Sequence, residues 1–213
     1  MGSYVVGVAG GSGAPYALRV LEGLLNGGHQ VSAVFSHAGR RVFELEADIH
    51  LTGEPGSDRK TLAAALGLES GAERLRLFAL DDFGASIASG SFKTDGMVIV
   101  PCSMGTLGRI AMGAGSSLLE RAADVTLKER RKLVVVPREA PLNLIHIRNM
   151  ATLTEAGAEV FPAMPGFYQR PRTVQDVIDS VAGRVLERLG VESRFLQRWT
   201  GPEAANRRWA EED

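Results

Sequence analysis

The fold is decided by one short run, Leu133-Val134-Val135-Val136-Pro137-Arg138-Glu139-Ala140-Pro141-Leu142. Its first four residues are apolar and mostly β-branched, which is typical of a strand buried on both faces of a parallel sheet. Pro137 then ends the strand, because proline has no N–H to donate to a neighbouring strand. The run therefore predicts a central strand and the point at which it stops.

Two opposite charges, Arg138 and Glu139, follow this strand directly. Ligands of open α/β sheets bind outside the carboxyl ends of the strands, so the pair stands where a functional site is expected. A surface ion pair in a turn explains the same two residues equally well. This stretch alone leaves both interpretations open.

Similar strand patterns recur along the chain, with helical patterns between them: residues 5–9, 30–35, 75–80, 96–100 and 158–161. This alternation favours an α/β fold with a doubly wound parallel sheet, a Rossmann-like or flavodoxin-like three-layer domain. At 213 residues the chain suits one domain. We expect it to span residues 1–200, followed by a polar tail at 201–213.

Composition excludes several classes of protein. The formal net charge of −1 gives no reason to expect a nucleic acid or an anionic membrane as partner. No apolar run approaches the roughly 20 residues of a membrane span, and no signal-peptide pattern opens the chain. Cys102 is the single cysteine, which excludes an intrachain disulfide and argues against a zinc cluster. We expect a cytoplasmic enzyme or binding protein.

A glycine-rich turn follows the first predicted strand: Gly10-Gly11-Ser12-Gly13-Ala14-Pro15. Between a strand and a helix N-terminus, such a turn lets backbone N–H groups approach an anion, helped by the helix dipole. The spacing matches neither the dinucleotide motif G-x-G-x-x-G nor the P-loop. The turn is a candidate phosphate or flavin contact, with a plain tight turn as the alternative.

Hydroxyl groups follow two more of the predicted strands. Ser36 stands where a dinucleotide fold usually has an acidic residue for the ribose, so it argues against NAD and suits a phosphate oxygen. Ser103 and Thr106 open the helix after residues 96–100 and could both reach an anion or a heterocycle edge. Ser103 also suits a helix N-cap, and the two roles are compatible.

Charged residues on two predicted helices have structural interpretations. Ser117 and Glu120 form a capping-box pattern that opens a helix running to about residue 131, where Arg130 and Arg131 would favour the helix dipole. Arg121 lies in its first turn, where a cation is disfavoured, which hints at a partner. Glu46, near the end of the helix predicted at 38–47, reads as solvated.

Three further segments carry predictions. Residues 51–72, rich in glycine, form an excursion around a short helical pattern at 61–66. A helix at 143–156 carries Leu144, Ile147, Met150 and Leu153 on one face. Residues 162–171 form a stiff proline-rich loop at the same sheet edge as the other candidate groups. In the helix that follows, Arg184 either snorkels or points into a site.

Together these segments resemble the flavin prenyltransferase family of the UbiX and Pad type, long labelled aromatic acid decarboxylases. The similarity covers nearly the whole chain in the same order, apart from residues 51–72 and the tail. The matching stretches are Gly10-Gly11-Ser12-Gly13-Ala14, Pro101-Cys102-Ser103-Met104, Arg121-Ala122-Ala123-Asp124-Val125, Leu127-Lys128-Glu129-Arg130-Arg131, Pro137-Arg138-Glu139-Ala140-Pro141-Leu142, Pro165-Gly166-Phe167-Tyr168-Gln169-Arg170-Pro171 and Arg184-Val185-Leu186.

The resemblance implies a metal-independent enzyme that joins a dimethylallyl group to N5 and C6 of reduced FMN. The product, prenylated FMN, would pass to a decarboxylase of the UbiD type. The donor would be dimethylallyl monophosphate or diphosphate. Family members assemble as homododecamers with sites between subunits, so the resemblance implies a homododecamer here as well.

The resemblance also implies roles for individual residues. FMN contacts fall on Gly10, Gly11, Ser12, Ser36, Ser103, Met104, Gly105, Thr106 and Arg121. The prenyl-phosphate site falls on Lys128, Arg138, Tyr168 and Arg184, which suits chemistry that needs cations on a departing phosphate. The catalytic positions are Glu139 as acid and base, Ser12 as a proton relay, Glu46, and Trp199 as the aromatic beside an allyl cation.

Two departures from the family pattern stand out. Gly11 replaces a usual alanine, and Gly105 replaces a frequent lysine and so removes a charge near the flavin. Two other functions are alternatives: an FMN-dependent cysteine decarboxylase of the same superfamily, and a non-catalytic FMN carrier subunit of a decarboxylase. A cysteine decarboxylase would carry an Asn-containing motif at the position where this chain has Cys102-Ser103-Met104. The second would not need Glu139, Lys128 and Arg184 together.

Overall fold

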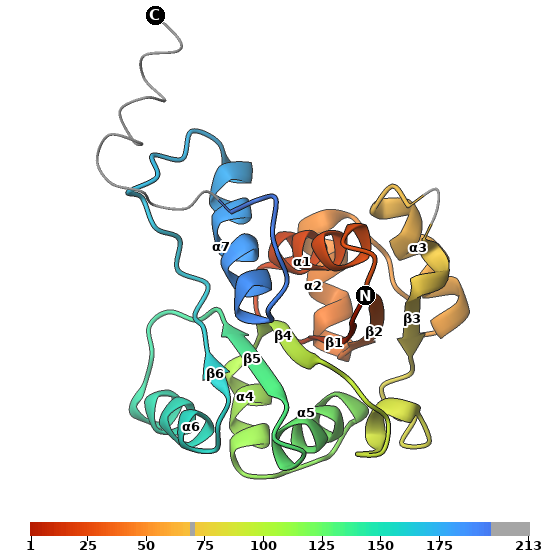
Figure 1. The fold of residues 1–213 in the computed structure, drawn as a ribbon. Helices are drawn as coiled ribbons and strands as arrows, with labels where there is room; N and C mark the ends of the chain where they lie inside the picture. Colours follow the sequence, from red (N-terminus) through yellow and green to blue (C-terminus); the bar gives the residue numbers. More distant parts are fainter. Residues whose placement is uncertain (69–70, 197–213) are drawn as a thin grey trace, which may run out of the picture.

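A parallel β-sheet forms the centre of the computed structural model, which describes residues 1–68 and 71–196 (Figure 1). Within these residues, six strands pair in the order β3-β2-β1-β4-β5-β6, and every pairing is parallel. The strands are β1 (Ser3–Val8), β2 (Gln30–Phe35), β3 (Leu75–Phe78), β4 (Gly96–Cys102), β5 (Lys132–Pro137) and β6 (Glu159–Val160). The predicted doubly wound parallel sheet is confirmed.

Strand β5 contains the apolar run Leu133-Val134-Val135-Val136 and lies beside β4. Ile99 pairs with Val135, and both are fully buried, as expected for strands covered on both faces. β5 ends at Pro137 as predicted. β4 continues past Pro101 to Cys102, which pairs with Pro137 after a shift in register.

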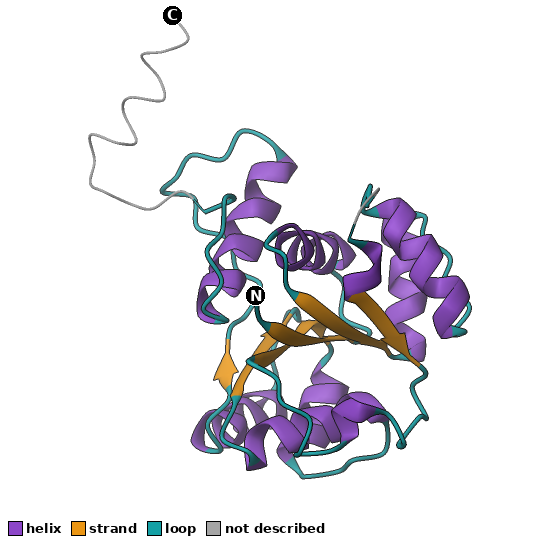
Figure 2. Ribbon diagram, turned by 45° about the vertical axis from the view of Figure 1, so that its right-hand side comes forward, coloured by secondary structure: helices purple, strands orange, loops and turns teal. Residues whose placement is uncertain are grey.

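Helices cover both faces of the sheet and form a three-layer structure (Figure 2). One core cluster packs against α1 (Ala14–Asn26), α2 (His37–Ala47), α3 (Pro55–Ala65) and α7 (Val174–Arg188). A second cluster packs against α4 (Met104–Ala111), α5 (Leu118–Lys128) and α6 (Leu144–Glu155) on the other face. Short 3-10 turns, η1 (Ala72–Arg74) and η2 (Ser86–Ala88), precede β3 and β4.

Three helices differ from their predicted form. α3 begins at Pro55, earlier than the pattern at 61–66, because the Glu54 carboxylate accepts from two N–H groups of its first turn. α5 ends at Lys128, so the interpretation of Arg130 and Arg131 as last-turn residues was wrong. Arg131 instead donates to carbonyls of the 90–92 loop. On α6 only Leu153 is buried, and the rest of the expected apolar face is more open.

The strand order places the functional candidates at one edge. Because β1 and β4 are neighbours, the chain winds away from β1 in opposite directions, and the loops after these strands part there. The segments after β1, β2, β4 and β5 all leave from this carboxyl edge. No helix among the described residues is both long and apolar enough to cross a bilayer.

Candidate functional site

A cleft of about 720 Å³ opens at this edge of the sheet. Gly10, Ser36, Ser103 and Thr106, four of the predicted flavin contacts, line it together. They come from the segments that follow β1, β2 and β4. The other lining residues are His37, Ala38, Arg40, Thr52, Gly53, Ala79, Leu80, Asp81, Arg109, Ser116, Ser117, Leu119 and Glu120.

The glycine turn packs tightly against its neighbours, most of all at Gly10. A Cβ at Gly10 would lie 2.5 Å from the Cβ of Ala38, and one at Gly11 would lie 3.1 Å from the Cys102 carbonyl oxygen. Gly13 has a φ of 132°, a conformation that favours glycine. These contacts bring the backbone of the turn against α2 and the end of β4, beside the cleft.

Two helix N-termini point at the cleft. Ser36 caps α2 by accepting from the Gly39 N–H, and Ser103 caps α4 by accepting from the Thr106 N–H at 3.3 Å. The Ser103 hydroxyl also donates to Thr106 Oγ1 at 3.1 Å. The predicted Ser103 cap is confirmed. Helix N-termini attract anions, so this side of the cleft favours a phosphate.

Glu46 is not simply solvated, although its side chain remains partly exposed. Its Oε2 accepts from the N–H groups of Gly13 at 2.8 Å and Ala14 at 2.9 Å, and the Ser12 hydroxyl also donates to this carboxylate. Burial alone would raise the pKa of the Glu46 carboxyl, but these hydrogen bonds and the charge of Arg138 lower it overall. Glu46 thus holds the glycine turn from the end of α2.

Arg138 joins this group from the end of β5. Its Nε donates to the Ser12 carbonyl oxygen at 3.1 Å, which brings together three predicted site residues, Ser12, Glu46 and Arg138. Glu139 is exposed, and its carboxylate accepts from the Ala140 N–H at 3.2 Å. Beside Arg138 and Glu139 lies a cavity of about 220 Å³ with mostly apolar walls, among them Leu142, Met150, Pro162 and Met164.

A third cavity, of about 150 Å³, holds the remaining residues predicted from the C-terminal part. Tyr168 and Arg184 line it, and Met164 lines both this cavity and the one beside Glu139. The Arg184 guanidinium lies 5.9 Å from the centre of the Phe161 ring and 3.6 Å from the Glu187 carboxylate. Arg138, Tyr168 and Arg184 therefore border adjoining cavities.

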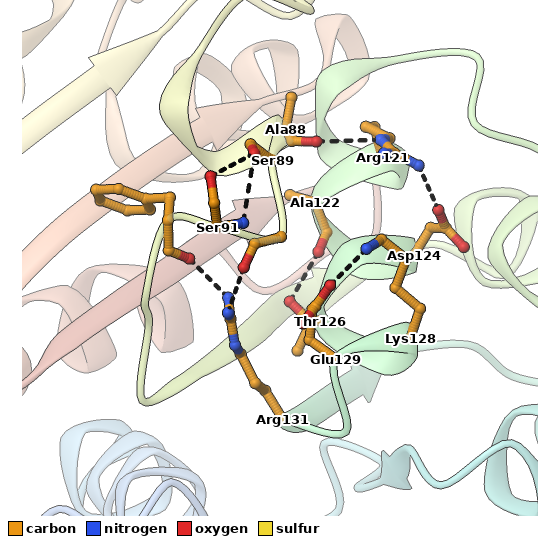
Figure 3. A network of polar contacts seen from close by, with 12 residues as sticks. Ala88, Ser89, Ser91, Arg121, Ala122, Asp124, Thr126, Lys128, Glu129 and Arg131 are labelled. Atoms are coloured by element: carbon orange, nitrogen blue, oxygen red, sulfur yellow. Dashed lines mark hydrogen bonds and ion pairs between the residues drawn. The ribbon is translucent and has the colours of Figure 1, made fainter.

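Arg121 and Lys128 lie elsewhere on this chain, on α5 beside the loop of Ala88 and Ser89 (Figure 3). Arg121 donates to the Ala88 carbonyl oxygen at 3.2 Å and to Asp124 at 2.7 Å. Lys128 pairs with Glu129 at 2.5 Å. An 11-residue helix is about 16 Å long, and Lys128 lies just before β5 begins, at the edge of the sheet opposite the cleft. This chain does not bring Lys128 to Arg138, which follows the opposite end of β5.

The remaining predicted residues lie in the first turn of α4 or outside the described part of the chain. Met104 is buried at the first position of α4, and Gly105 follows it on the same turn. Trp199 and the tail at 201–213 lie outside the described residues. Burial raises the pKa of the Cys102 thiol to about 12, so this side chain is a neutral core group. In the described part of the chain, no three His, Cys, Asp or Glu residues gather to hold a metal.

The sequence did not indicate the ion pair of Arg109 and Glu120 on the cleft wall. The Ser117 hydroxyl accepts from the Glu120 N–H, as the capping-box pattern predicts. The Glu120 carboxylate accepts instead from Ser116 and from Arg109. Burial alone would raise the pKa of the Glu120 carboxyl, but these partners lower it. The contact joins two helices, so no spacing within one helix could reveal it.

Comparison with known proteins identifies the relatives of this chain. Residues 3–186 match the family described as Flavoprotein. The flavin prenyltransferase UbiX of Halalkalibacterium halodurans is 48% identical over 198 residues, which cover 93% of each chain.

Solved structures agree in fold and extent. AnUbiX (PadA1), in complex with FMN and dimethylallyl pyrophosphate, superposes with a TM-score of 0.82 at 37% identity, covering 93% of this chain and 97% of that one. A dodecameric FMN-dependent UbiX-like decarboxylase from Escherichia coli O157:H7 gives 0.81 at 39% identity, covering 93% and 100%. The cysteine decarboxylase SpaF, at 20% identity and a TM-score of 0.53, shares the fold alone, covering 76% and 84%.

Proposed function

The chain belongs to the Flavoprotein family and, within it, to the flavin prenyltransferases. From this premise we propose that it joins a dimethylallyl group to reduced FMN without a metal. The allylic C–O bond breaks and phosphate leaves. Prenyl C1 bonds to flavin N5, which loses its proton. A proton then adds to prenyl C2, so that prenyl C3 becomes electrophilic and bonds to flavin C6, and loss of the C6 proton gives prenylated FMN.

One observation carries this proposal: Arg138, which lines the small apolar cavity, donates to the Ser12 carbonyl oxygen in the glycine turn, and Gly10 of the same turn lines the large cleft. The cleft is large enough for a flavin nucleotide, whereas the apolar cavity suits a short hydrocarbon chain. A flavin and an allylic phosphate could thus meet near the glycine turn. This arrangement suits group transfer between two bound molecules better than storage of one.

In the cleft, backbone and hydroxyl groups would hold FMN. Gly10, Gly11 and Ser12 supply N–H groups, while Ser36 and Thr106 supply hydroxyls near the two helix N-termini. Ser103, Met104 and Gly105 complete this wall as the first turn of α4. The phosphate of FMN would lie toward the helix N-termini.

Beside the apolar cavity, cations would assist departure of the prenyl phosphate. Arg138, Tyr168 and Arg184 would contact its oxygens, which gain negative charge as the C–O bond breaks. Glu139 would protonate the departing phosphate and accept the proton from flavin C6. Ser12, held by Glu46, would relay a proton at N5. Trp199 remains the predicted aromatic neighbour of the allyl cation.

Arg121 and Lys128 would reach such a site from a neighbouring copy. They lie seven positions apart on α5, hence on one side of it, and in this chain Lys128 lies at the sheet edge opposite Arg138. Leu144, Ile145 and Ile147 on α6 expose apolar side chains that contact between copies would cover. Together with the dodecameric relative, these features support a homododecamer with shared sites.

The product would serve a decarboxylase of the UbiD type, and we place the protein in the cytoplasm. An FMN-dependent cysteine decarboxylase shares only the fold. A flavin carrier would not need the cations and the carboxylate around the apolar cavity.

The test is anaerobic incubation with reduced FMN and dimethylallyl monophosphate, or the diphosphate in parallel, followed by mass spectrometry of the extracted flavin. A flavin heavier by one prenyl group is expected with one donor. Recovery of unmodified FMN with both donors would exclude the proposed reaction.

A further inference from the structure

Arg109 is fixed on two sides at the wall of the cleft. Its Nε donates to Glu120 Oε1 at 2.5 Å, and its Nη2 donates to Thr106 Oγ1 at 3.1 Å. Glu120 is only 3% exposed, and Ser116 holds it through both its N–H and its hydroxyl. The guanidinium therefore has a set orientation before any ligand arrives.

The third nitrogen of this guanidinium, Nη1, is left open. No described residue accepts a hydrogen bond from it, although a guanidinium has five N–H donors. The side chain of Arg109 is 48% exposed. A Cβ at Gly105 would lie 3.6 Å from Nη1, so a side chain at this position would begin in contact with this nitrogen. Glycine at 105 keeps the donor accessible from the cleft.

The surroundings of Nη1 favour an anion. Arg40 and the capping hydroxyls of Ser36 and Ser103 line the same cleft, at the positive ends of α2 and α4. Glu120 balances the charge of Arg109 from the far side, on Nε, and leaves the Nη1 edge free to donate. Guanidinium groups bind phosphate oxygens through such edges.

We propose that Arg109 binds the phosphate of FMN through Nη1, held in place by Glu120 and Thr106, and that Gly105 keeps this contact open. The inference rests on the proposed flavin binding and adds a phosphate-binding residue that the family resemblance did not indicate. A purely structural Arg109, tying α4 to α5, would need only its Nε and Nη2 contacts. If Arg109 binds phosphate, its loss weakens binding only of a flavin that carries a phosphate; if Arg109 is purely structural, the phosphate makes no difference.

The test compares FMN with riboflavin, which lacks the phosphate, by calorimetric titration of the full chain freed of flavin. Arg109→Ala should weaken FMN binding roughly tenfold to a hundredfold, the range for one charge-assisted hydrogen bond, and change riboflavin binding by less than about twofold. Arg188→Ala is the matched control, because Arg188 is also 48% exposed and pairs with a glutamate, Glu159. Equal losses for both flavins, or no loss, would overturn the inference.

Arg109→Ala leaves Glu120 buried without its cation, so a second pair of variants protects the test. Arg109→Ala with Glu120→Gln removes that charge and should show the same selective loss of FMN binding. Arg109→Ala with Gly105→Lys sets a new cation over the vacated edge and should recover most of the lost affinity. A folded double variant with no recovery contradicts the proposed position of the phosphate.

Failure of this inference and failure of the proposed reaction give different results. If the wild-type chain binds FMN but forms no prenylated flavin, the proposed function fails and the phosphate contact can still be measured. If Arg109→Ala forms product and binds FMN as the wild type does, the function stands and the inference about Arg109 fails.

Discussion

Arg138 and Glu139 are adjacent in the chain but have different surroundings. Arg138 is anchored to the Ser12 carbonyl oxygen and faces the glycine turn. Glu139 is exposed and accepts only a local hydrogen bond from the Ala140 N–H, among the bonds of the described residues. A fixed cation suits binding of a phosphate, whereas a loosely held carboxylate can exchange protons with its surroundings. This difference supports the division of roles proposed for the pair.

Glu139→Gln should therefore bind FMN normally and form product roughly a hundredfold to ten-thousandfold more slowly, the range for loss of a general acid or base. Single-turnover formation of prenylated FMN under anaerobic conditions measures the rate. Glu73→Gln, an exposed glutamate away from the cavities, is the control. Loss of FMN binding in the Glu139 variant would contradict its role in proton transfer.

Cys102 precedes the cleft-lining residue Ser103 in the chain, but its thiol is buried in the core. The thiol is fully buried, and its pKa is raised to about 12, so almost no thiolate forms near neutral pH. We expect iodoacetamide at pH 8 to leave the native protein unmodified and to label it once in urea, as read by intact mass. Rapid labelling of the native protein would show an accessible thiol instead.

At the scale of elements, the contact between α4 and α5 depends on Glu120. Its pKa is lowered in the folded state, so its charge stabilises the fold above its ordinary unfolded pKa of about 4.3. That contribution is lost as the pH falls through the lower folded pKa. Below this range the carboxyl is protonated in both states and contributes no pH dependence.

Glu120→Gln should lower the free energy of unfolding at pH 7 by about 1–3 kcal/mol, because its donors lose a charged partner. As the pH falls below about 5, the free energy of unfolding should decrease less for the variant than for the wild type, because the variant lacks this one carboxyl group. Urea unfolding across this pH range measures both effects, with exposed Glu155→Gln as control. Parallel pH curves for Glu120→Gln and wild type would contradict the lowered pKa.

Elements were predictable where local patterns determine them, and contacts between elements were not. Buried strands such as β5 and the Ser103 cap follow from residues close in the chain. Glu46 holds a turn more than 30 residues away, and Arg109 meets Glu120 across two helices. Such pairs depend on how helices pack onto the sheet, which no sequence period encodes. Glu46 entered the predicted site only through family resemblance.

At the scale of the whole molecule, the predicted site residues fall into two groups. Arg138, Tyr168 and Arg184 border adjoining cavities at the carboxyl edge, while Arg121 and Lys128 lie on α5 beside the 86–91 loop (Figure 3). The α5 helix holds Lys128 at the sheet edge opposite Arg138, so one folded chain does not bring these two cations together. Assembly of copies can, because symmetry presents one surface of each copy to a different surface of its neighbour.

A mixing experiment tests this division. Lys128→Ala and Arg138→Ala should each be nearly inactive alone, since each removes a cation from every site. Co-expressed chains should recover roughly a quarter of the wild-type activity, because random assembly gives that fraction of sites both intact residues. The rate of product formation per total chain is the measurement. Co-assembled chains as inactive as the single variants would contradict a site shared between copies.

The central claim is that FMN and an allylic phosphate meet at the glycine turn, and a crystal structure of the full chain with both bound tests it most directly. Oxidised FMN with dimethylallyl monophosphate would form an unreactive complex. The flavin is expected in the cleft with its phosphate near Ser36, Thr106 and Arg109, and the prenyl phosphate on Arg138 and Arg184. Flavin density outside this cleft, or a prenyl phosphate remote from Arg138, would contradict the account.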